Sequence, residues 1–238
     1  MPIGVIVNAL TVLFGGLLGA LLGNRIPERL RNSFPLIAGL SSMSMGIANI
    51  VEMNKLPVVI LSIVLGSIVG ELIKLEQGIK FCVHRIHKLL NRYIPSKQYV
   101  DQKEFMDKFI AIMIIFTVSG TGIFGALNEG MTGDYSILFA KSILDFFTAA
   151  IFAVVLGFIV MILAIPQFIV LFSLFLTASI ILPLLTPSII ADFTAVGGMI
   201  MLATGFNIAG IKIFPLGNML PAMIFVIPIS HFWSIFIN

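Results

Sequence analysis

Charged residues are scarce in this chain of 238 residues: only 11% are Asp, Glu, Lys or Arg, whereas 59% are hydrophobic. Soluble domains carry about 25% charged and about 45–50% apolar residues. The mean hydropathy of +1.12 is correspondingly high. The composition excludes an ordinary soluble domain and predicts an all-α, polytopic helical membrane protein.

Cysteine occurs once, at Cys82, which excludes a disulfide framework or a thiolate metal cluster. The three histidines, His84, His87 and His231, lack the spacing of metal ligands. There is no Gly-Lys-Ser/Thr loop to hold phosphate, and no evident Ser/His/Asp arrangement. We therefore expect no enzyme activity, no metal or other cofactor, and no nucleic-acid partner.

Hydropathy predicts eight transmembrane helices, because about 20 apolar residues cross a bilayer. The stretch 135–185 could instead hold one long kinked helix and one short one, with a break near Ile165 and Pro166. The N-terminal segment has neither the basic region nor the cleavage site of a signal peptide, so we expect it to be retained. The spans are Gly4–Gly23, Pro35–Val51, Pro57–Leu75, Lys108–Leu127, Tyr135–Gly157 (with a possible extension to Ala164), Gln167–Leu185, Phe193–Ile211 and Met219–Phe236.

Lys and Arg fall almost entirely on one side of the membrane in this eight-span arrangement. Lys55 falls on the other side, and Lys141 lies inside the membrane. The basic side of a membrane protein is cytoplasmic, so both termini are predicted to be extracytoplasmic. The residues on the basic side are Arg25, Arg29, Arg31, Lys74, Lys80, Arg85, Lys88, Arg92, Lys97, Lys103, Lys108 and Lys212.

The segment Ile79–Ile94 differs from the spans. Its apolar residues fall on one helical face, and its Lys, Arg and His residues fall mostly on the other. This pattern predicts a basic amphipathic helix that lies on the anionic lipid headgroups of the cytoplasmic surface. The alternative is a regulatory or partner-docking helix.

A glycine pattern recurs near the two ends of the chain. Gly39 and Gly46 stand seven residues apart, as do Gly198 and Gly205, and a Leu-Pro step opens the next helix in both places. We interpret the first and last three spans as inverted repeats, a common arrangement in transporters; chance similarity of Gly-rich helices is the alternative. The predicted units are a first repeat (1–77), an interfacial helix and linker (78–107), a middle two-helix unit (108–165) and a second repeat (166–238).

Lys141 and Asp145 are the only charged residues between Tyr135 and Ile165. Their i, i+4 spacing places both side chains on one helix face, where they can pair. A charge deep in a bilayer costs at least a few kcal/mol, so it persists where it is paired or faces a wet interior. The pair is therefore either a static brace between helices or a proton- or cation-linked switch in a transport path.

Other polar and small residues could join that path. Glycines that recur in the repeat pattern, or in a weaker third copy, could break helices and expose backbone groups, although close helix packing explains most glycines. Intramembrane asparagines could line the path or form interhelical hydrogen bonds, and an acid before the charged helix could form an outer mouth. These candidates are Gly46, Gly122, Gly205, Asn8, Asn49, Asn207, Asn218 and Glu129.

The chain resembles an uncharacterised bacterial membrane family, domain-of-unknown-function family 554, whose members often carry the label of transport protein. The resemblance implies a bacterial inner-membrane protein. Together with the residues, it predicts a transporter of a small solute or ion, with a channel or a non-transporting scaffold or sensor as alternatives, and a possible homo-oligomer. The matching residues are Asn8 with Gly15-Gly16, Gly70-Glu71, Glu129-Gly130 with Gly133-Asp134, Lys141-Ser142 with Leu144-Asp145, Ala195–Gly198 and Asn218–Ala222.

Overall fold

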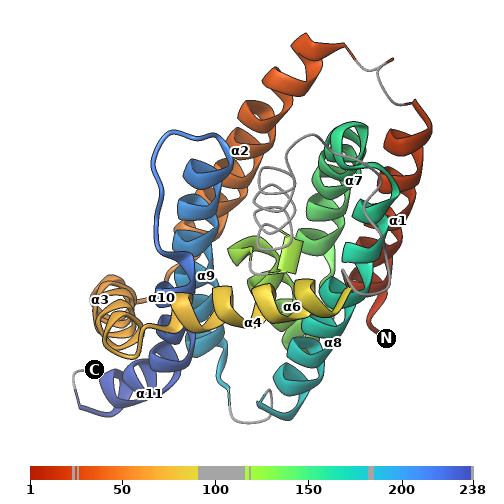
Figure 1. Cartoon of the computed structure of the whole chain (residues 1–238). Coiled ribbons are helices and arrows are strands. Elements are labelled where there is room, and N and C mark those ends of the chain that lie inside the picture. The colour runs from red at the N-terminus through yellow and green to blue at the C-terminus, as the bar shows by residue number, and fades with distance from the viewer. Residues whose placement is uncertain (23–24, 26, 91–115, 118, 182–184, 237–238) are drawn as a thin grey trace.

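The computed structural model describes residues 1–22, 25, 27–90, 116–117, 119–181 and 185–236, and these ranges contain helices and no strand (Figure 1). The predicted all-α membrane fold is confirmed. The elements are α1 (Ile3–Leu22), α2 (Glu28–Val51), α3 (Leu56–Leu72), α4 (Leu75–Leu90), α6 (Gly120–Thr132), α7 (Ser136–Leu156), the 3₁₀ helix η2 (Gly157–Leu163), α8 (Ala164–Ile181), α9 (Pro187–Ile208), α10 (Leu216–Met219) and α11 (Pro221–Phe236).

Six helices among the described residues are long and apolar enough to cross a membrane, and a seventh span results if α3 and the start of α4 are counted together. The predicted count of eight is not confirmed. α6 has 13 residues and is about 20 Å long, which is shorter than the hydrocarbon core of about 30 Å. The predicted span Lys108–Leu127 lies partly outside the described residues, and its described part is interrupted at Ser119.

Several predicted helix boundaries were wrong, and prolines and a glycine explain the differences. α2 begins after Pro27 and runs through Pro35, where it was expected to start. α7 does not extend to Ala164, because Gly157 adopts a φ of +71° and the chain turns into η2. α8 then begins before Pro166, which occupies its first turn, where a missing N–H leaves no helical hydrogen bond unmade.

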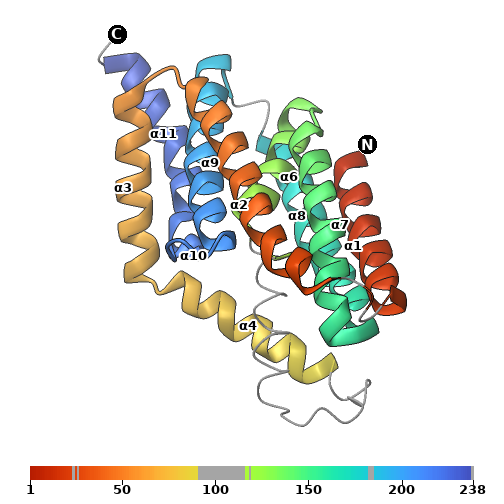
Figure 2. The same ribbon diagram turned by 90° about the horizontal axis from the view of Figure 1, so that it is seen from above.

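α4 leaves the bundle at a sharp corner. Lys74 has a positive φ of 54°, and α3 and α4 are bent by 55° relative to each other. α4 then runs across one end of the bundle (Figure 2), with Lys80 and Arg85 exposed. The helix starts at Leu75, before the predicted Ile79, and residues 91–94 lie outside the described part of the chain.

The predicted breaks at Gly46 and Gly205 are wrong, because α2 and α9 are continuous there. These glycines instead allow two antiparallel helices to touch. A Cβ on Gly46 would lie 2.6 Å from the carbonyl oxygen of Gly198, and one on Gly205 would lie 2.6 Å from the carbonyl oxygen of Gly39. Only residues without a side chain permit such close contact between two helix backbones.

The helix pairs that pack together in the bundle are of two kinds, parallel and antiparallel. α1 and α7 are parallel neighbours: Gly15 of α1 lies against Phe146 and Gly19 against Ala150. α3 and α11 are antiparallel, like α2 and α9. Figure 2 shows the first residues of α1 and the last residues of α11 at the same end of the bundle. The parallel packing of α1 on α7 places the charged pair of α7 beside Asn8 of α1.

Candidate functional site

The site is built around an ion pair in the middle of α7. Lys141 and Asp145 are buried, at 3% and 6% exposure, and the lysine Nζ contacts Asp145 Oδ2 one helical turn away. The ammonium also lies 5.9 Å from the ring centroid of Phe116. A Cβ on Gly122 would approach the lysine Cε to 2.9 Å, so this glycine makes room for the lysine stem. The predicted pair is thus formed, with predicted Gly122 beside it.

Asp145 is held by helices that lie far apart in the sequence. Its Oδ2 accepts hydrogen bonds from Asn8 Nδ2 of α1 at 2.8 Å and from Gln167 Nε2 of α8 at 2.9 Å, besides that from Lys141. Gln167 Nε2 also donates to Asn8 Oδ1. Asn8 and Gln167 are fully buried, and Gln167 Oε1 has no hydrogen-bond partner among the described residues. The paired charges therefore have the additional hydrogen bonds that a buried ion pair requires.

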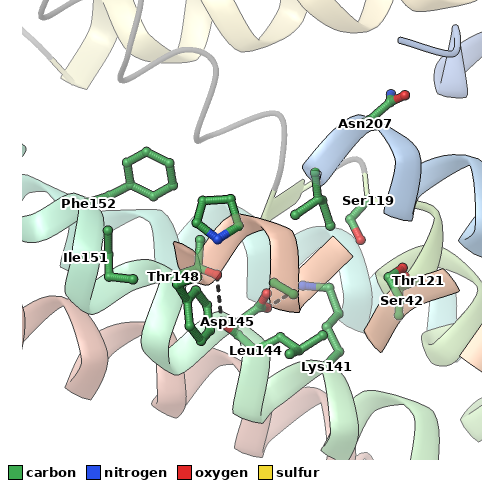
Figure 3. Close-up of a pocket in the computed structure, with 14 residues that line it drawn as sticks. Ser42, Ser119, Thr121, Lys141, Leu144, Asp145, Thr148, Ile151, Phe152 and Asn207 are labelled. Carbon is green, nitrogen blue, oxygen red and sulfur yellow. Dashed lines mark hydrogen bonds and ion pairs between the residues drawn. The ribbon is translucent and has the colours of Figure 1, made fainter. Parts of the chain in front are cut away.

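A cavity of about 100 Å³ reaches this ion pair (Figure 3). Its walls come from α2, α6, α7 and α9, with Ser119 between Thr117 and the start of α6. One water needs roughly 10–15 Å³ of such space, so the cavity has room for several waters or a small solute. Its polar lining residues are Ser42, Ser119, Thr121, Lys141, Asp145, Thr148 and Asn207.

The start of α6 borders the cavity. Ser119 caps this helix, and its side chain accepts a hydrogen bond from the Gly122 N–H at 3.2 Å. Thr121 in the first turn is hydrogen-bonded to Ser42 of α2 at 3.1 Å. A helix N-terminus carries partial positive charge. The cavity wall is mainly apolar, and it also presents an ammonium, a carboxylate, hydroxyls and a helix start that offer polar contacts to an occupant.

Other predicted path residues bind neighbouring helices. Glu129 is 2% exposed, and its two oxygens accept from the backbone N–H groups of Gly4 and Val5, at 2.8 and 3.2 Å, so it caps α1. Asn218 Oδ1 accepts from Glu76 N at 2.8 Å at the start of α4. Neither of these two residues is part of the cavity wall.

Two further predicted asparagines, Asn207 and Asn49, differ in whether they line the cavity. Asn207 lines the cavity and also holds the α9–α10 connection, because its side chain bonds both the N–H and the carbonyl of Phe214, at 2.7 and 2.9 Å. Asn49 Nδ2 contacts Met201 Sδ at 3.3 Å and is not among the lining residues. Gly46 and Gly205 lie in the contact of α2 with α9.

Sequence reasoning missed Gln167, Ser42 and Thr148. A neutral amide in an apolar helix attracts less notice than a charge, but Gln167 had one detectable signal. It follows Asn8 by 159 residues, the same interval that relates the glycines of the repeat pattern. In the part of the chain that the structure describes, no three His, Cys, Asp or Glu side chains gather in a way that would hold a metal ion.

The fold and site define a multi-pass α-helical membrane protein with a buried ion pair beside a cavity whose mainly apolar wall includes both charges. The chain belongs to the family described as "Protein of unknown function (DUF554)", whose model matches residues 3–231. The resemblance seen in the sequence is thereby confirmed.

Two relatives cover nearly the whole chain. "Uncharacterized protein YqgA" of Escherichia coli (strain K12) is 49% identical over 98% of each chain. "Uncharacterized membrane protein YdfK" of Bacillus subtilis (strain 168) is 25% identical over 93% of this chain and 92% of its own. No solved structure matches the chain. The name of the second relative agrees with the membrane class.

Proposed function

We propose that the protein is a bacterial inner-membrane transporter of a small solute or ion, and that the cavity beside Lys141 and Asp145 is its substrate site. The observation that carries the proposal is the joint presence of a buried ion pair and a cavity whose wall includes both charges. Charges inside membrane helices are expensive, and those that border a cavity mark ion or substrate pathways. A purely structural brace would need the pair but not the space beside it.

Inverted repeats form the second part of the proposal, and a constant sequence interval supports them. Asn8 and Gln167 are hydrogen-bonded to each other across 159 residues, and Ser42 Oγ donates to Met201 O across the same interval. The interval also relates the two glycine pairs of the repeat pattern, Gly39 to Gly198 and Gly46 to Gly205. Equivalent residues of two copies meet in this way on a two-fold axis.

The antiparallel contact between α2 and α9 fits such an axis. Gly39 lies against Gly205, and Gly46 lies against Gly198, so each glycine of one copy meets the non-equivalent glycine of the other. Asp145 then receives one amide hydrogen bond from each copy, from Asn8 and Gln167. Transporters commonly place their site between inverted repeats and expose it alternately by rocking one against the other.

The proposed orientation places the basic side of the molecule in the cytoplasm and both termini outside. In this orientation α4 lies on the anionic headgroups of the inner leaflet, with Lys80 and Arg85 exposed to them. Exposed Phe81 offers an apolar anchor beside these charges. A homo-oligomer stays a prediction from the sequence.

A flux screen in proteoliposomes tests the proposal. The purified chain is reconstituted, and uptake of cations, anions and small metabolites is measured at two pH values against protein-free vesicles. A saturable flux that depends on an ion or pH gradient supports a coupled transporter. Ohmic conductance without coupling supports the channel, and no flux of any species at either pH favours the scaffold or sensor.

A further inference from the structure

We propose that Asp145, Asn8 and Gln167 form a binding site for a monovalent cation, in which the Lys141 ammonium is a resident cation that an incoming proton or alkali ion replaces. The site would supply the coupling ion of the transporter proposed above, and the inference rests on that function for its role but not for its test. The ion pair alone would not suggest a cation site. The amides of Asn8 and Gln167, which contact Asp145, do suggest one.

Three helices bring oxygen-bearing side chains together at the charged pair. Asp145 has its carboxylate, and the amides of Asn8 and Gln167 each donate an N–H to its Oδ2. Each amide also carries an oxygen: Asn8 Oδ1 accepts from Gln167 Nε2, and the other is Gln167 Oε1. Gln167 Oε1 is the decisive atom, because it belongs to a fully buried residue and has no hydrogen-bond partner in the part of the chain that the structure describes. An unpaired buried acceptor is unfavourable, so a state in which a cation or an O–H group pairs with it is favoured.

A cation supplies that partner in either of two chemistries. Alkali ions are hard cations that bind carboxylate and amide carbonyl oxygens, which are the groups gathered here. A proton that binds to the Asp145 carboxylate creates an O–H donor, and Gln167 Oε1 is an acceptor free to receive it. The cavity beside Asp145 has room for water, through which either ion would reach the site.

Charge balance requires the ammonium to leave Asp145 when another cation binds there, and the displaced ammonium must then be hydrated or paired with an anion in the cavity. Asp145 and Lys141 together carry no net charge, so a second cation beside Lys141 would leave an uncompensated buried charge. Five elements lie beside α7 in the described part of the chain, and three of them carry no charged side chain: α1, η2 and α8. The other two are α6 and α2. α6 carries Glu129, which caps α1, and the start of α2 carries Glu28, Arg29 and Arg31.

The cavity also offers space into which the Lys141 ammonium can move. The Lys141 side chain forms part of the cavity wall, as do Ser119 and Thr121. Gly122 leaves space along its stem. When a cation occupies Asp145, the ammonium can therefore turn toward the cavity and remain hydrated or contact the transported solute.

The test removes the resident cation and asks whether an added one substitutes for it. Lys141→Met keeps the length of the side chain without its charge, and Lys141→Ala is the second variant. The full chain in detergent micelles is melted in NaCl, LiCl or KCl against choline chloride at equal ionic strength, from pH 6 to pH 9. The matched controls are Lys141→Met/Asp145→Asn, which lacks the proposed site, and Asp192→Asn, which alters a buried carboxylate outside the cavity.

Ligands that bind only the folded state raise its Tm, so the stranded carboxylate of Lys141→Met should gain roughly 3 °C or more from a cation. A rise with one alkali chloride over choline at fixed pH identifies an alkali ion. A rise as pH falls, equal in all salts, identifies a proton, because protonation removes the stranded charge. Adding Gln167→Leu to Lys141→Met should reduce either response.

The proposal is overturned if Lys141→Met responds to alkali ions and pH no more than Lys141→Met/Asp145→Asn does, or if Asp192→Asn shows the same response. Flux is not measured here, so the two claims fail separately. A protein that gains cation stabilisation but moves no solute keeps this site and loses the proposed transport function.

Discussion

Asn8 of α1 and Gln167 of α8 are hydrogen-bonded to each other and donate to the same oxygen of Asp145. Their interval of 159 residues equals that between Ser42 and Met201, which meet at the crossing of α2 and α9. Two helix pairs thus share one register. The buried charge of Asp145 on α7 therefore lies where the two halves of the chain meet. A change in its protonation or in its ion-pair partner would alter its contacts with both halves.

The ion pair should show strong coupling in stability measurements. Asp145→Asn or Lys141→Met strands a buried charge, and loss of one partner of such a pair costs about 3–5 kcal/mol. The double variant should lose less than the sum of the two single losses. Equilibrium unfolding in SDS/detergent mixtures measures the cycle. As a control, Lys141→Met and Asp192→Asn should be additive; additivity of Lys141→Met with Asp145→Asn as well would contradict the observed pairing.

The contact between α2 and α9 should tolerate no side chain at its glycines. Gly198→Ala places a Cβ 2.6 Å from the carbonyl oxygen of Gly46, so the helices must separate, at a cost of about 1–3 kcal/mol. Gly78→Ala in α4 is the matched control, because nothing lies within 4 Å of its new Cβ. That change should be neutral or stabilise by up to about 1 kcal/mol, since Ala favours helix more than Gly does. Equal Tm values for the two variants would argue against backbone contact.

Glu129 should support stability rather than transport. In Glu129→Gln an NH₂ replaces one of the oxygens that accept from the N–H groups of Gly4 and Val5, and the charge at the start of α1 is lost. We expect a loss of about 1–2 kcal/mol from the weakened cap. Flux per folded molecule, measured beside Tm, should stay near that of the wild type. A collapse of flux at unchanged Tm would restore the outer-mouth role that the sequence suggested.

The cavity should be accessible to small polar reagents. In a Cys82→Ser background, Thr148→Cys places a thiol at the cavity wall, and Ala149→Cys places one in an apolar cluster on the next position of α7. A small cationic methanethiosulfonate should modify the first far faster than the second, because Ala149 is fully buried. Labelling is read by mass spectrometry in vesicles. Similar rates at both positions would mean that the cavity is not distinguished by its access to water.

Sequence patterns were sufficient for the charged core of the site. The i, i+4 spacing of Lys141 and Asp145 predicts their contact because helix geometry is regular, and the cost of buried charge indicates that they matter. The glycine spacing predicted a correspondence between helices at the two ends of the chain, which stays a proposal. It did not indicate that these helices would cross at those glycines, because a glycine in a helix permits both a break and a close contact.

The rest depended on tertiary contacts that no local pattern encodes. Glu129 lies beside an exposed turn in the sequence, yet it caps α1 through the N–H of Gly4, 125 residues earlier. In the sequence, Gln167 is a single amide in an apolar helix. Its role becomes visible only in the structure, where Asn8 and Asp145 lie beside it. The predicted helix start at Pro35 was wrong, because a helix can continue through a proline. The predicted end at Gly157 agrees with α7, which ends at Leu156 where the φ of Gly157 is positive.

Flux per folded molecule in proteoliposomes, compared among the wild type, Asp145→Asn and Asp192→Asn, tests the central claim most directly. Both variants replace a buried aspartate by its isostere, but only Asp145 borders the cavity. The account predicts that the wild type and Asp192→Asn move the solute identified by the screen, and that Asp145→Asn loses most of that flux while remaining folded. Full activity of folded Asp145→Asn would contradict it.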